Sequence, residues 1–409
     1  MKIINLGTLK IRFLLFGYFA LLAGTAEAQH PFKYDSLYKT MYANEFCRFI
    51  QDNPDVVLID VRSAGEFCDT SHMASLNKGH LKGAINISVD SIKSNIHVLD
   101  SYKDKPIVFY CSHSQRSRRV SKLLSENGFA NYYNLNGGMT SLNELHHTDF
   151  PCKEELIISG LAFSNRSCDD LARLIRTEKN LVIIDVRPSI QFNAKDTIAD
   201  NNIGRIKGAI NIPYDEFQNR QSELDPYRSQ SILVYSASGD GDGSRTAAAL
   251  ANNGFNKVNL LLTGLNDFIA SQDVSLFVEN GTPFTIVNPL RALKLLKDHK
   301  DLIVYDTRVS EEYNNARTGT ISYKNLGHIR NAIHTEKQHF SSVPLSKNKG
   351  TPILIYGNEE AAEFASYLAT KGYKKVFLLT GLYDFVWSAF NVESCKDAIQ
   401  FLTDHVGIY

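Results

Sequence analysis

The sequence predicts an α/β protein made of three tandem units, each a small open parallel sheet with helices on both faces. An apolar run ending in Asp-x-Arg occurs three times, and its aspartates lie 125 and 121 residues apart. A second apolar run ends 51 residues beyond each aspartate, at Cys111, Ser236 and Gly357. The repeated aspartates are Asp60, Asp185 and Asp306. This period has the size of an independent domain, which is too long for a solenoid repeat.

Within each unit, strand-like runs alternate with helical patterns. The runs are continuously apolar, as expected for parallel strands that helices cover on both faces. Ser167 precedes two acidic residues and an apolar spacing of three and four, which indicates a helix start. Asn288-Pro289 gives the same signal in the third unit. The aspartates of the Asp-x-Arg motifs are expected to be structural, each pairing with an arginine at the end of a strand.

Composition places the chain among globular proteins and leaves its partners open. Its 409 residues are 43% hydrophobic and 22% charged, and 44 basic side chains balance 44 acidic ones. A formal charge of zero gives no general attraction to nucleic acid or to an anionic membrane. Any anion that the protein handles must therefore meet a local site.

The N-terminus resembles an export signal. Lys2, Lys10 and Arg12 precede an apolar run over residues 13–23, and small residues followed by Ala-Glu-Ala extend to Ala28. This pattern predicts a signal peptide over residues 1–28, and a membrane anchor is disfavoured because the apolar run is shorter than the ~20 residues of a span. We therefore expect a periplasmic or secreted protein with no membrane contact after cleavage. Turn-forming residues then divide the remaining chain into units 29–150, 151–280 and 281–409.

Six cysteines are too few for a disulfide scaffold in a chain of this length. No Cys-x-x-Cys occurs, so neither a redox pair of that type nor a zinc ribbon is indicated. In an oxidising compartment some cysteines could pair, and Cys152 with Cys168 is the nearest couple in sequence, but spacing alone establishes no bridge.

Cys111 is the candidate nucleophile. It ends an apolar strand and precedes a short loop and a helix, which is where open parallel sheets collect their ligands. Backbone N–H groups of the loop and the helix dipole would favour its thiolate, and Arg116 would add positive charge. The alternative is an inert buried cysteine, and Cys111 alone leaves the two interpretations about even.

Several motifs in the first unit together resemble the rhodanese-like sulfurtransferase family, and weaker versions cover the other two units. They are residues 60–62 with 66–67, 79–86, 111–117 and 137–138. The resemblance implies that Cys111 takes sulfane sulfur from a small anionic donor such as thiosulfate and passes it from a persulfide to a thiol or cyanide. No cofactor and no metal is implied.

The same resemblance assigns the loop residues. The backbone amides of the loop would hold the negative charge, and Arg116 would orient the donor. The implied substrate-binding set is Ser112, His113, Ser114, Gln115, Arg116 and Ser117. Four residues separate Cys111 from Arg116, as in sulfurtransferases, whereas related phosphatases have five. Ser114 stands where the family often has glycine, so its side chain would crowd the anion-binding loop if the backbone needs a positive φ.

The second and third units lack the nucleophile. Ser236 and Gly357 occupy the cysteine position, and the loops that follow are acidic. Asp240, Asp242 and Ser244 have the first spacings of a calcium loop, but its later positions do not fit, which favours a solvated turn. These units are expected to shape the cleft or to bind a protein partner. The alternative for the whole chain is a non-enzymatic binding or scaffold protein in which Cys111 is a remnant.

Overall fold

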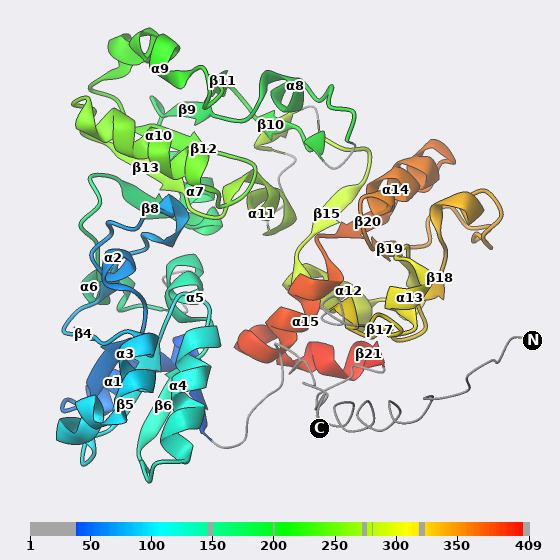
Figure 1. Cartoon of the computed structure of the whole chain (residues 1–409). Helices are drawn as coiled ribbons and strands as arrows, with labels where there is room; N and C mark the ends of the chain where they lie inside the picture. Colours follow the sequence, from blue (N-terminus) through cyan, green and yellow to red (C-terminus); the bar gives the residue numbers. More distant parts are fainter. Residues whose placement is uncertain are drawn as a thin grey trace, which may run out of the picture.

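The computed structural model describes residues 38–145, 150–198, 201–271, 276–279, 281–318 and 324–403. It contains three five-stranded parallel sheets, one in each unit. Figure 1 shows the first unit in blue and cyan, the second in green and the third in yellow to red. The expected signal peptide over residues 1–28 lies outside the described residues. Within the described part of the chain, none of the helices has the length and apolarity that a membrane crossing needs.

The three sheets have the same strand order. In the first unit it is β1-β6-β5-β2-β4, in the second β8-β13-β12-β9-β11 and in the third β15-β20-β19-β16-β18. The first sheet comprises β1 (Lys39–Met41), β2 (Val57–Asp60), β4 (Ile85–Asn86), β5 (Ile107–Tyr110) and β6 (Tyr132–Leu135). The second comprises β8 (Ser164–Arg166), β9 (Val182–Asp185), β11 (Ile210–Asn211), β12 (Ile232–Tyr235) and β13 (Val258–Leu261). The third comprises β15 (Thr285–Val287), β16 (Ile303–Asp306), β18 (Ile333–His334), β19 (Ile353–Tyr356) and β20 (Val376–Leu379).

Helices pack on both faces of each sheet, as the apolar runs predict. The first unit carries α1 (Ala43–Asp52), α2 (Ala64–Phe67), α3 (Val89–Ser94), α4 (Gln115–Ser125), α5 (Gly138–Glu144) and α6 (Lys153–Leu156). The second carries α7 (Cys168–Thr177), α8 (Ser189–Phe192), α9 (Phe217–Arg220), α10 (Gly241–Asn252) and α11 (Gly264–Ser271). The third carries α12 (Pro289–Asp298), α13 (Ser310–Tyr313), α14 (Glu360–Thr370) and α15 (Leu382–Asn391). Ser167 and Asn288 cap α7 and α12 with their side chains, which confirms both predicted helix starts.

A short antiparallel pair closes each unit. β3 (His80–Leu81) pairs with β7 (Ile157–Ile158), β10 (Arg205–Ile206) with β14 (Val278–Glu279), and β17 (His328–Ile329) with β21 (Leu402–Thr403). The first pair extends the first unit to Ile158, beyond the boundary at residue 150 that the sequence favours. Leu156 and Ile157 pack against the core of the first unit, so Pro151 is a turn inside that structural unit.

The three Asp-x-Arg motifs form the same buried ion pair. In the first unit the carboxylate of Asp60 accepts hydrogen bonds from Arg62 Nε and Nη2, and Nη2 also donates to the carbonyl of Gly79. The other two units repeat these contacts through Asp185 and Asp306. The predicted structural role of these aspartates is therefore confirmed. In each unit the arginine thus connects the end of a central strand to the glycine that precedes the short antiparallel strand pair.

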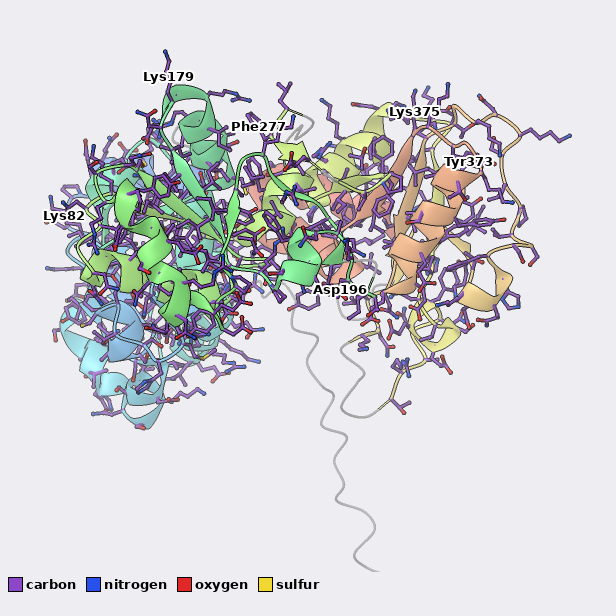
Figure 2. The ribbon with its side chains drawn as sticks, turned by 90° about the horizontal axis from the view of Figure 1, so that it is seen from above. Lys82, Lys179, Asp196, Phe277, Tyr373 and Lys375 are labelled. Atoms are coloured by element: carbon purple, nitrogen blue, oxygen red, sulfur yellow. A yellow bond between two sulfur atoms is a disulfide. The ribbon has the colours of Figure 1, made fainter. Side chains whose placement is uncertain are left out.

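Contacts between the units bring them around a common centre. The second and third units share an apolar cluster that includes Phe268, Phe277 and Phe364, and Figure 2 shows Phe277 between these two units. The first and third units meet where Asn136 Nδ2 donates to the carbonyl of Phe390 at 2.8 Å. The first and second units meet where η1 (Ala74–Leu76) packs near α10.

A disulfide joins Cys47 on α1 to Cys152, with their Cα atoms 5.8 Å apart. Cys152 therefore does not pair with Cys168, its nearest neighbour in sequence, which is a free thiol on α7. The bond connects the start of the first unit to the segment that leads into α6. Residues 105 positions apart become neighbours because the sheet brings α1 and the end of the unit together.

Candidate active site

Cys111 lies at the carboxyl end of β5, at the start of the loop that leads into α4. The first turn of α5 fixes this loop, because Met139 N–H donates to the carbonyl of Cys111 at 2.9 Å and Thr140 N–H to that of Ser112 at 3.0 Å. This close approach requires glycine at position 138, whose φ is +54°. A Cβ at Gly138 would lie 2.1 Å from the Cys111 carbonyl oxygen. The first turn of α5 thus fixes the backbone at the start of the Cys111 loop.

The thiol of Cys111 is 1% exposed and packs in an apolar cluster with Val61, Val89 and Val120. The hydroxyl of Ser117 lies 3.7 Å from its sulfur. Val61 and Val89 also line a hollow of about 480 Å³ together with Arg116. The hollow thus adjoins the apolar cluster in which Cys111 packs.

Arg116 is held in a fixed position by Glu66 on α2. Its two terminal nitrogens donate to the two carboxylate oxygens at 2.6 and 2.7 Å, and one of them also donates to Ser112 Oγ at 2.6 Å. Hydrogen bonds from Arg116 and Ser63 lower the pKa of Glu66 to about 2 against the opposing effect of burial, which is the largest single influence. The pKa of Arg116 is raised, first by Glu66 and then also by the charge of Cys111. Arg116 therefore supplies a permanent positive charge beside the sulfur.

Ser114 adopts the positive φ at which glycine would be favoured, with a value of 76°. Its side chain does not crowd the loop after Cys111, because it is buried against the turn between β6 and α5. There its hydroxyl lies 3.2 Å from Asn136 Oδ1 and accepts a hydrogen bond from Gly137 N–H at 2.5 Å. The strained backbone is thus partly compensated by hydrogen bonds that glycine could not make.

The side chains of His113 and Gln115 are not part of the cluster that packs around Cys111. Both side chains are exposed and line a cavity between the three units. Although the side chain retains solvent exposure, desolvation by the protein atoms around it lowers the pKa of His113 to about 4, and the charges of Lys78 and Arg116 act in the same direction. His113 is therefore neutral near pH 7, in keeping with the secondary role that the sequence favours for it.

The structure groups Ser112, Arg116 and Ser117 around Cys111, whereas the side chains of His113, Ser114 and Gln115 lie elsewhere. Sequence reasoning missed Glu66 and Asn134 as members of the site. Ser63 and Glu66 form a capping box at the start of α2, and this Ser-x-x-Glu pattern was the available signal for Glu66. Asn134 gave no such signal, because it reaches Ser117 only through the pairing of β6 with β5.

Ser236 and Gly357, at the positions equivalent to Cys111, do not provide a comparable thiol. Ser236 donates its hydroxyl to the carbonyl of Ser238 at 2.6 Å, and Asp240 caps α10. At Gly357 a Cβ would lie 2.0 Å from Thr307 Oγ1, so a cysteine there would require Thr307 to move. Among the described residues no group of three or more His, Cys, Asp or Glu side chains is arranged to hold a metal ion.

Comparisons with known proteins agree with the repeat. A family model described as a rhodanese-like domain matches residues 43–145, 167–271 and 289–386. The tRNA uridine(34) hydroxylase of Cronobacter sakazakii is 30% identical over 92 residues, which are 22% of this chain and 24% of that protein. The uncharacterized protein YqhL of Bacillus subtilis is 38% identical over 81 residues, which are 20% of this chain and 56% of that protein. This chain therefore spans less than two thirds of these relatives.

Solved structures give similarities of low overall score. A thiosulfate sulfurtransferase from Pseudomonas aeruginosa has 18% identity and a TM-score of 0.22, with 85% of this chain and 67% of that chain covered. A structure of an EanB variant with hercynine has 14% identity and a TM-score of 0.26, with 87% of this chain and 96% of that chain covered. The assignment of the chain rests on the family model, which matches most of it.

Proposed function

This chain belongs to the family of rhodanese-like domains, and we propose that its first unit is an exported sulfurtransferase that carries sulfane sulfur on Cys111. The observation that carries the proposal is the arrangement of the Cys111 loop. A thiol stands at the end of a central strand, and a guanidinium that Glu66 immobilises lies beside it. An arginine in this place favours a thiolate and attracts an anionic donor.

The proposed reaction has two steps. The Cys111 thiolate attacks the outer sulfur of thiosulfate, the sulfur–sulfur bond breaks, and sulfite leaves with the electron pair. The outer sulfur remains on Cys111 as a persulfide. Cyanide or a thiolate then attacks that terminal sulfur, and the cysteine thiolate leaves. No external oxidant or reductant is needed, because the sulfane sulfur moves from one nucleophile to another.

The proposal also gives Ser117 a role in stabilising the thiolate. Its hydroxyl lies near Cys111 and is 2.6 Å from Asn134 Oδ1, while the buried NH2 group of Asn134 has no partner among the described residues. A half-turn of the Asn134 amide would let this NH2 donate to Ser117 Oγ. The Ser117 proton, no longer donated to Asn134, would then be shared between the Ser114 carbonyl at 3.1 Å and the thiolate sulfur at 3.7 Å, which stabilises the nucleophile.

The remaining units would shape the site and bind partners. The loops that follow β12 and β19 carry no nucleophile and line the same central cavity as His113. Export to the periplasm or beyond remains part of the proposal. The disulfide between Cys47 and Cys152 supports it, because such bonds persist in oxidising compartments. N-terminal sequencing of the secreted protein should begin at residue 29.

A second candidate is a non-enzymatic binding protein. It is favoured by the burial of Cys111, whose thiol is 1% exposed. In that case a sulfur donor would not reach the thiol, and the three units would act only through their surfaces.

Mass spectrometry of the intact protein after incubation with thiosulfate distinguishes the two. The enzyme should gain one sulfur atom, and Cys111→Ala should gain none. Cys68→Ala is the matched control, because Cys68 is an exposed free thiol in the same unit, and this variant should behave as the wild type. An unchanged mass in a folded wild type, or a gain that persists in Cys111→Ala, would contradict the proposal.

A further inference from the structure

A central cavity lies where the three units meet at the carboxyl ends of their sheets. It has two adjoining chambers of about 590 and 840 Å³, which is the range of small-molecule sites. The first chamber receives residues from the loops that follow β5, β12 and β19. Residues from all three units line both chambers, among them Glu144, Thr263, Asp267, Thr380 and Asp384.

Acidic side chains occupy one part of this cavity. Asp267 and Asp384 stand at the same position of their units, three residues after the glycine of the Thr-Gly-Leu motif. They and Glu144 form no ion pair with any described residue. Burial raises the pKa of Asp267 to about 6, assisted by Asp384, and raises that of Glu144 to about 7. All three side chains remain exposed at the cavity, and the charge of Lys78 opposes the rise in the pKa of both Glu144 and Asp267.

Lys78 supplies the opposite charge in the first chamber. It precedes Gly79 as Ile203 precedes Gly204 and Leu326 precedes Gly327, so a lysine replaces a buried apolar residue in the first unit alone. Lys78 is 8% exposed, close to the 5% of Ile203 and the 6% of Leu326. A charged group at a core position costs stability unless something compensates it.

Within the protein, Lys78 has a hydrogen bond to Thr140, and the charges of Glu144 and Asp267 act on it from beyond ion-pair distance. Its Nζ donates to Thr140 Oγ1 at 2.7 Å, and it forms no ion pair with a carboxylate within the described ranges. Thr140 stands at the position that holds Asp267 and Asp384 in the other units, so the first unit has a hydroxyl where they have a carboxylate. Burial is the main reason that the pKa of Lys78 is lowered. Lys78 lines the first chamber, and an ammonium carries three donors, so an anion in that chamber would find a donor there.

We propose that this cavity binds a small zwitterion of the amino-acid or short-peptide class. Its carboxylate would accept from Lys78 Nζ and from the hydroxyl of Thr140, and its ammonium would lie between Asp267 and Asp384. Lys78 and the two aspartates would then each face a ligand charge of opposite sign. The site is separate from the sulfur chemistry and does not depend on it.

Calorimetric titration of the full chain with trialanine tests the site. Two blocked peptides report on its two ends, N-acetyl-trialanine without the ammonium and trialanine amide without the carboxylate. Trialanine should bind, and each blocked peptide should bind at least tenfold more weakly. Lys78→Met should lose the preference for trialanine over its amide while keeping the preference over the acetylated peptide. The double variant Asp267→Asn with Asp384→Asn should show the reverse.

Matched controls carry the same chemical changes outside the cavity. Lys82→Met and Asp55→Asn alter exposed residues of the first unit, and Figure 2 shows Lys82 at its outer surface. Both should bind trialanine as the wild type does. Cys111→Ala should also bind it, which separates this site from sulfur transfer. No binding at millimolar peptide, equal binding of the blocked peptides, or folded cavity variants that keep both preferences would overturn the proposal.

Discussion

The guanidinium of Arg116 donates to both carboxylate oxygens of Glu66, at 2.6 and 2.7 Å. Fifty residues separate the two in sequence. The contact joins α2, which follows one central strand, to the first turn of α4, which follows the next. Since Arg116 also bonds Ser112, this pair closes the Cys111 loop on itself. With these partners, Arg116 holds a fixed position from which its charge stabilises the conformation of the Cys111 loop. Contact with a sulfur donor is its second role.

Glu66→Gln should make the protein less stable at neutral pH but change little in acid. The pKa of Glu66 falls from an ordinary 4.5 to about 2 in the folded state, which corresponds to about 3 kcal/mol. A lowered folded pKa contributes stability above about pH 4.5, and that contribution is lost as the pH falls toward 2. Urea unfolding at several pH values should therefore show a gap between wild type and variant that narrows below pH 4.5. A gap that does not change with pH would contradict this role.

Ser114→Ala should destabilise the protein more than Ser114→Gly. Alanine keeps the positive φ, which costs a side-chain-bearing residue roughly 1–2 kcal/mol, and glycine removes that cost. Both variants lose the hydroxyl that accepts from Gly137 N–H, and an unpaired buried donor costs about 1–3 kcal/mol. Thermal unfolding should rank wild type above Gly and Gly above Ala. Equal stability of the two variants would show that the left-handed backbone is not strained.

Ser117→Ala should slow alkylation of Cys111 at neutral pH while the fold is kept. The hydroxyl lies 3.7 Å from the sulfur, and hydrogen bonding to the thiolate increases the reactive fraction. The rate of reaction with iodoacetamide, followed by peptide mass spectrometry, measures this effect. Cys68 in the same sample is the internal control, and its rate should not change. A faster reaction of Cys111 would indicate that Ser117 only blocks access.

Removal of the disulfide should cost stability of the first unit. The bond between Cys47 and Cys152 closes a segment of 105 residues, for which restriction of the unfolded chain predicts roughly 2–5 kcal/mol. The double variant Cys47→Ser with Cys152→Ser should unfold at lower urea than the wild type. Reductant should lower the wild-type midpoint and leave that of the variant unchanged. Cys168→Ser, which removes a free thiol, should respond to reductant as the wild type does.

Lys78→Leu should leave the free energy of unfolding unchanged or raise it by up to about 2 kcal/mol, because an apolar side chain replaces a buried charge. The third unit already holds Leu326 at this place. Chemical denaturation compares the variant with the wild type. A loss of more than about 2 kcal/mol would mean that Lys78 serves the fold, and its role in the cavity would then need another explanation.

Part of the fold followed from local patterns. Apolar runs of four residues predicted the central strands, Ser167 and Asn288 marked helix starts, and the Asp-x-Arg motifs predicted buried ion pairs. Each of these depends on neighbours in sequence, so it could be identified before any packing was known. The position of Cys111 at the end of a strand followed in the same way.

The sequence by itself determined the threefold repeat, the α/β class and the strand end that carries Cys111, because these depend on the order and spacing of residues. Only the tertiary structure decided which distant side chains meet. It placed Arg116 against Glu66, joined Cys47 to Cys152 and brought Lys78 to Thr140, 62 residues away. Contacts of this kind depend on how strands are ordered in a sheet and how units pack. Spacing along the chain does not specify either of these.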